Sequence, residues 1–108
     1  MGLHAFDVSL EMIEAVKPVI QRVAKKDRAL ANQMRRAASS VPLNISEGSQ
    51  RFGRDRQHHY RIAAGSAREL RAALRVAQLW DYVDDSVVES VDGILDKELA
   101  LLWGLTKP

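Results

Sequence analysis

Cysteine is absent from the 108-residue sequence. Its absence excludes disulfides, thiolate catalysis and cysteine-based zinc sites, and it suits a reducing compartment. No apolar stretch is long enough to cross a membrane, and residues 1–6 are too few and too polar to form a signal peptide. We therefore expect a soluble, cytoplasmic protein without membrane contact, folded as one domain over residues 1–108.

Signatures of catalysis and of metal binding are also missing. Residues 48–53 lack the glycine spacing and the lysine of a nucleotide-binding loop. His58 and His59 are adjacent, so on a helix their side chains point about 100° apart rather than toward one metal ion. We predict no catalytic residue, no metal site and no cofactor, and we expect that the protein is not an enzyme. A small hydrolase or metal enzyme built around Glu47, His58 or His59 is the least favoured alternative.

Strand-like alternation is absent as well, whereas apolar residues recur at steps of three and four along the chain. This period predicts an all-α protein. The first helix presents one apolar face, formed by Phe6, Ile13, Val16, Ile20 and Val23. We expect Asp7 to cap its start and Pro18 to bend it.

A second helix is predicted to start at Asp27. Its apolar positions, from Leu30 to Ile45, keep their helical phase straight through Pro42. This continuity favours one long helix that is kinked near Pro42 and ends near Gly48, although two helices joined by a turn would satisfy the same pattern.

Two further amphipathic helices complete the predicted fold. The third has a seam formed by Tyr60, Ala63, Ala67, Leu70, Leu74 and Ala77, which is widened by Ile62, Ser66, Ala73, Val76 and Trp80. The fourth has an apolar face formed by Val87, Val91, Ile94, Leu95, Leu99 and Leu102. Four amphipathic helices with short links predict an antiparallel up-down bundle.

Charge is divided sharply along the chain. Residues 28–75 contain ten arginines and three acids, whereas residues 76–108 contain two lysines and seven acids. Four arginines of the third helix are spaced seven residues apart and form one file with a neighbour, which we call the arginine file: Arg54, Arg61, Arg68, Arg75 and the adjacent Arg71. The file would extend over roughly 31 Å. Guanidinium groups donate bidentately to phosphate, so the arginine file predicts contact with a nucleic-acid backbone.

Other candidates support this prediction, and other readings compete with it. The supporting candidates are Arg35, Arg36 and Arg51. No aromatic residue lies in the arginine file, so the sequence gives no support for base stacking. The fourth helix carries a matching acidic file, formed by Asp85, Glu89, Asp92 and Asp96. The two files could be solvated surfaces, could neutralise each other within one chain, or could pair between subunits and close a ring.

A second set of residues combines small and polar side chains at nearly core positions: Pro42, Asn44, Glu47, Gly48, Gly65, Ser66 and Glu69. We expect the third helix, through its residues Gly65, Ser66 and Glu69, to hold Asn44 and Glu47. This network would fix the kink and satisfy the carbonyl group that Pro42 leaves without a partner. We favour this structural role over catalysis.

Three stretches of the chain resemble a family of small bacterial four-helix bundle proteins. They are residues 33–38, residues 40–48 with the following Arg51, and residues 62–66 with the following Glu69-Leu70. Some members of this family are encoded in intervening sequences of 23S ribosomal RNA genes and are often labelled ribosomal. The resemblance covers most of residues 30–82. It implies a four-helix bundle without an established enzymatic activity.

A more distant resemblance links the chain to the accessory protein of diversity-generating retroelements. This resemblance implies a homo-oligomeric ring, with a pentamer as the expected form, that binds nucleic acid and a protein partner. Together, the residues and the resemblances favour a non-enzymatic oligomeric bundle that binds RNA, or less favourably DNA, through its arginines. The alternative is a module for protein interaction or self-assembly whose basic and acidic faces pair between subunits.

Overall fold

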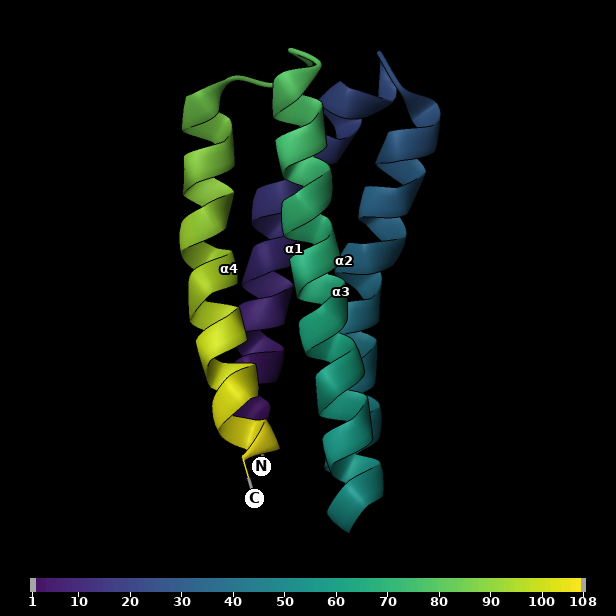
Figure 1. Cartoon of the computed structure of the whole chain (residues 1–108), viewed down its shortest axis with the longest axis vertical. Coiled ribbons are helices and arrows are strands. Elements are labelled where there is room, and N and C mark those ends of the chain that lie inside the picture. Colours follow the sequence, from purple (N-terminus) through teal and green to yellow (C-terminus); the bar gives the residue numbers. More distant parts are fainter. Residues whose placement is uncertain (1, 108) are drawn as a thin grey trace.

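The computed structural model describes residues 2–107, which form four helices (Figure 1). The helices are α1 (Leu3–Ala24), α2 (Arg28–Ser49), α3 (Gly53–Leu79) and α4 (Asp85–Thr106). Each helix runs opposite to the one before it, and each packs against two others, so that α1 and α3 occupy opposite corners. The antiparallel up-down bundle is confirmed. None of the helices in this range has the length and apolar character needed to cross a membrane.

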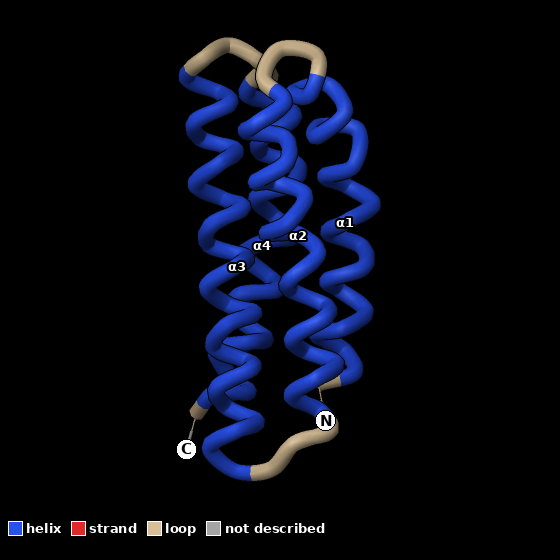
Figure 2. The backbone as a smooth tube through the Cα atoms, turned by 90° about the vertical axis from the view of Figure 1, so that its right-hand side faces the viewer, coloured by secondary structure: helices blue, strands red, loops and turns tan. Residues whose placement is uncertain are grey.

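The bundle measures 42 × 23 × 19 Å and has two different ends. Figure 2 shows that α1 starts and α4 ends at the same end as the connection between α2 and α3, which we call the terminal end. The opposite end, which we call the distal end, carries the connections between α1 and α2 and between α3 and α4. Adjacent helices are therefore in contact along most of their length.

Local sequence signals account for most helix boundaries. The backbone N–H of Leu30 donates to Asp27 Oδ1 at 2.9 Å, so Asp27 caps α2 as predicted. Helix α2 continues through Pro42, which excludes the alternative of two helices. The prediction that Asp7 caps α1 is wrong, because α1 begins at Leu3. Ala5 is buried, and its burial extends the apolar face of α1 upstream of Asp7.

Alanines and β-branched residues let the helices approach closely in the core. The six predicted seam residues of α3 are all buried. Of the positions predicted to widen the seam, Ala73 is buried and Ser66 is half-buried, but Ile62, Val76 and Trp80 are exposed. The widening fails at these three positions because α3 lies at a corner and packs mainly against α2 and α4, so it buries only a narrow stripe.

Gly48 marks the closest approach between α2 and α3. A Cβ atom added at Gly48 would lie 2.8 Å from Tyr60 Cε1 and 3.2 Å from His59 Cβ. The Tyr60 ring is itself 1% exposed and cannot move aside. Position 48 therefore favours a residue without a side chain.

Substitution of Gly48 by alanine is expected to destabilise the bundle by about 1–2 kcal/mol. Overpacking a rigid core costs about 1–3 kcal/mol, and the better helix propensity of alanine offsets up to about 1 kcal/mol of that cost. Urea unfolding followed by circular dichroism measures the change. Gly65→Ala in α3 is the matched control, because nothing lies within 4 Å of its added Cβ. The control should be neutral or stabilising, and equal losses in both variants would contradict this packing argument.

Candidate nucleic-acid interface

The arginine file divides into two parts with different partners. Toward the distal end, Arg71 Nη2 lies 2.5 Å from Asp96 Oδ1, and Arg75 Nη2 lies 2.7 Å from Asp92 Oδ2. Arg71 Nε is also 3.6 Å from Asp92 Oδ1. Because Asp92 keeps only 18% of its side chain exposed, the two ion pairs that it makes are partly shielded from water, whereas the pair with the exposed Asp96 is not. They join α3 to α4 and occupy two of the four carboxylates in the acidic file.

Toward the terminal end, the same file is uncompensated. Arg54, Arg61 and Arg68 are exposed, and none of them has a hydrogen bond or an ion pair with any residue from 2 to 107. These three arginines, which we call the open arginines, span about 21 Å of helix. The open arginines are the part of the predicted site that can meet a ligand without breaking internal contacts.

The three supporting arginines have different surroundings. Arg51 Nε lies 3.1 Å from Glu47 Oε2, and its Nη1 lies 2.9 Å from Asp55 Oδ2. The hydrogen bonds that Arg51 donates, first to Glu47 and then to Asp55, raise the pKa of Arg51 and stabilise its charged form. Arg35 lines a hollow between α1 and α2, away from α3. Arg36 is exposed on α2, one turn before Ser40.

A polar network links the middle of α2 to α3. The Asn44 side-chain amide donates to the Ser40 carbonyl at 2.9 Å and to Ser40 Oγ at 3.0 Å. Ser66 Oγ of α3 donates to the same Ser40 hydroxyl at 2.8 Å. Asn44 Oδ1 lies 3.1 Å from His59 Nδ1, which acts as the donor because Oδ1 can only accept. The bond that α3 makes to Asn44 therefore comes from His59, whereas Ser66 bonds to Ser40.

Other parts of the predicted network are wrong. Glu47 does not reach α3, because it points outward and pairs with Arg51. Gly65 lies beside open space, so no close backbone approach requires it. Glu69 is exposed and borders a shallow hollow between α2 and α3. The Asn44 amide reaches the carbonyl of Ser40, whereas the carbonyl that loses its helical donor to Pro42 is that of Ala38.

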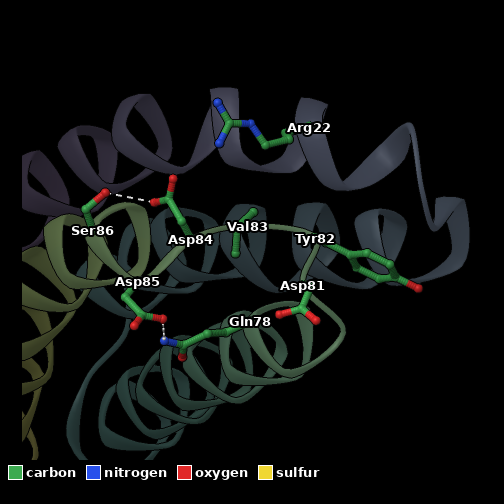
Figure 3. A pocket seen from close by; sticks show the side chains of 8 residues that line it. All are labelled: Arg22, Gln78, Asp81, Tyr82, Val83, Asp84, Asp85 and Ser86. Carbon is green, nitrogen blue, oxygen red and sulfur yellow. Dashed lines mark hydrogen bonds between the residues drawn. The ribbon is translucent and has the colours of Figure 1, made fainter.

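A larger hollow, of about 670 Å³, lies at the distal end of the bundle (Figure 3). Two acids of the connection between α3 and α4 and the first residue of α4 border it, with Arg22 of α1: Asp81, Asp84 and Asp85. Ser86 Oγ donates to Asp84 at 2.8 Å, and Gln78 Nε2 donates to Asp85 at 2.6 Å. The hydrogen bonds from Ser86 and from the Val87 backbone lower the pKa of Asp84. Asp85 thus bonds to α3 across the connection, and Asp84 caps the start of α4.

The histidines have separate surroundings. The rings of His58 and His59 are 5.8 Å apart in an edge-on arrangement, and His59 is engaged with Asn44. Across residues 2–107, no three His, Asp or Glu side chains are grouped so that they could hold a metal ion.

The structure draws attention to two further side chains of α4, of which sequence reasoning missed Glu98. Glu98 of α4 is completely buried, and burial raises its pKa to about 8. Its position three residues after Leu95 and four before Leu102 places it on the apolar face, which was a readable signal. For Trp103 the sequence left two interpretations open, packing in the core or at a helix end, or an exposed partner surface; Trp103 is 63% exposed.

The comparisons with known proteins agree with this architecture. The family model described as 23S rRNA-intervening sequence protein matches residues 2–104. A solved protein of unknown function from the S23 ribosomal protein family of Bacteroides thetaiotaomicron has the same fold, with a TM-score of 0.87 and 22% identity. This similarity covers 96% of the present chain and 99% of the other. No curated protein matches. The chain belongs to the family of 23S rRNA-intervening sequence proteins.

Proposed function

We propose that this chain is a non-enzymatic nucleic-acid-binding bundle that holds the phosphate backbone on the open arginines. One observation carries the proposal: Arg54, Arg61 and Arg68 stand exposed in one file without an ionic partner in the described chain, while their neighbours are neutralised. Three unpaired guanidinium groups along about 21 Å of a rigid helix offer regularly spaced donors to phosphates. Binding would therefore depend on charge and would be largely independent of sequence.

RNA is the ligand that we propose ahead of DNA, because the family is named after an intervening sequence of ribosomal RNA. A structural role for the polar residues between α2 and α3 supports the absence of catalysis in this proposal. Asn44 and Ser66 both donate to the Ser40 hydroxyl, and the bond from Ser66 joins α3 to α2. These polar groups therefore take part in hydrogen bonds that stabilise the packing of the two helices.

A salt titration tests the proposed function. Fluorescence anisotropy with a labelled RNA should show binding at low ionic strength, and log K should fall linearly as log salt rises. About three phosphate contacts predict a slope of roughly −2 to −3. The same titration with DNA of equal length shows whether RNA is preferred. No binding at low salt, or binding that does not change with salt, would contradict the proposal.

Self-assembly is a second candidate function, and we propose that it uses the face formed by α1 and α2. Asp92 and Asp96 already pair with arginines of the same chain. Only the other two acids of the acidic file are therefore left to pair with a neighbouring subunit. The face of α1 and α2 instead exposes Leu3, Leu10 and Leu43. It also contains two hollows of about 210 and 200 Å³. Exposed apolar patches of this kind mark contact surfaces. Light scattering of the purified protein, and of a Leu10→Glu variant, measures the assembly directly.

A further inference from the structure

Trp103 is an exposed aromatic side chain in the last turns of α4. Its exposed fraction of 63% is high for a residue type that normally buries most of its surface. Lys107 Nζ lies 3.8 Å from the centre of its ring, in a cation–π contact. The indole therefore faces solvent in a cationic setting.

The register between α3 and α4 places Trp103 among the open arginines. Asp96 pairs with Arg71, and Trp103 follows Asp96 by seven residues, on the same face of α4 and about 10.5 Å closer to the terminal end. The helices α3 and α4 are antiparallel (Figure 1). Seven residues toward the terminal end from Arg71, at the level of Trp103, α3 therefore carries Ala64. Arg61 and Arg68 lie about one turn on either side of that level.

The side of α3 that carries these arginines borders α4. Arg61 and Arg68 precede Arg75 by fourteen and seven residues, so the three share one face of α3. The Arg75 side chain reaches Asp92 of α4, so this face borders α4. After Asp96 the only acid of α4 is Glu98, which is buried. The seam between α3 and α4 therefore changes from ion pairs near the distal end to arginine, lysine and tryptophan near the terminal end.

We propose that Trp103 stacks on an unpaired base of a single-stranded nucleic acid whose phosphates lie on Arg61 and Arg68. This inference rests on the proposed function and names its ligand more closely. Positively charged grooves with an aromatic side chain are typical of single-strand binding, because every base offers a face for stacking. The bases of a duplex are already stacked on one another, so a duplex would gain only the arginine contacts. The site consequently prefers single strands.

Fluorescence in a Trp80→Phe background tests the stacking directly, because Trp103 is then the only tryptophan of the chain. Titration with a short oligouridine should quench the emission of Trp103. In the wild-type background, Trp103→Leu should weaken oligouridine binding roughly tenfold or more and change duplex RNA binding by no more than about twofold. Trp80→Leu is the matched control, since Trp80 is equally exposed but lies at the end of α3 near the distal end. It should leave both affinities unchanged.

Two different failures can be told apart. Salt-dependent binding of both RNAs that is insensitive to Trp103→Leu, without quenching, would overturn the stacking inference and leave the proposed function standing. The absence of salt-dependent binding to either RNA would overturn both.

Discussion

Replacement of Arg54, Arg61 and Arg68 together by alanine is expected to weaken RNA binding about 100-fold at moderate salt. Each phosphate contact that is lost removes the release of about 0.7 counterion, which is worth roughly a factor of five near 0.1 M salt, so three contacts give about 100-fold. The slope of log K against log salt should become shallower by about two units. Anisotropy titrations at several salt concentrations measure both quantities. Stability should change little, because the three side chains are exposed and make no internal bonds in the described structure.

A variant with the same change in net charge separates local contact from overall attraction. Lys17, Lys25 and Lys26 are exposed on α1 or just after it, away from α3. Their joint replacement by alanine should reduce affinity only a few-fold, through the weaker long-range field. Equal losses of RNA affinity in the two triple variants would show that the position of the open arginines does not matter. The proposed nucleic-acid interface would then be wrong.

Glu98→Gln is expected to remove a large dependence of stability on pH. Both carboxyl oxygens of Glu98 are buried without a hydrogen-bond partner in residues 2–107, and burial raises the pKa to about 8 from an ordinary value of 4.5. Below pH 4.5 the group is neutral in the folded and the unfolded chain, so it costs no ionisation energy. Between pH 4.5 and 8 only the unfolded chain loses the proton, and the free energy of unfolding falls by about 1.4 kcal/mol per pH unit.

Glutamine does not ionise, so the variant avoids this loss. As the pH rises from 4.5 to 8, the free energy of unfolding of the variant should increase relative to that of the wild type by on the order of 3–5 kcal/mol. Urea unfolding of both proteins across this range gives the difference, in which the other titrating groups cancel. Glu89→Gln is the control, because Glu89 lies on the same helix but is exposed. Parallel stability curves for Glu98→Gln and wild type would show that Glu98 is solvated in the folded protein.

The local chemistry of the sequence explains why the helices could be predicted so closely. Asp27 caps α2 because a carboxylate two or three residues before a free backbone N–H accepts from it, and this interaction needs no tertiary context. The buried seam of α3 follows from helical period alone. Trp80 and Ile62 were misplaced because the width of a buried face depends on how many neighbours a helix has, and α3 has two main ones.

The site was less accessible to sequence reasoning, for a different physical reason. Helical spacing determined that Arg54, Arg61, Arg68 and Arg75 share a face, since residues seven apart nearly superimpose on an α-helix. The register between α3 and α4 pairs Arg75 with Asp92 and leaves Arg61 and Arg68 without an ionic partner in the described chain. It also sets the level of Trp103 along the bundle relative to these arginines. That register is set by core packing and by the connection between the helices. The sequence by itself thus determined the helices and their charged faces, while only the tertiary structure decided which charges are neutralised and which stay available, because neutralisation is a contact between helices.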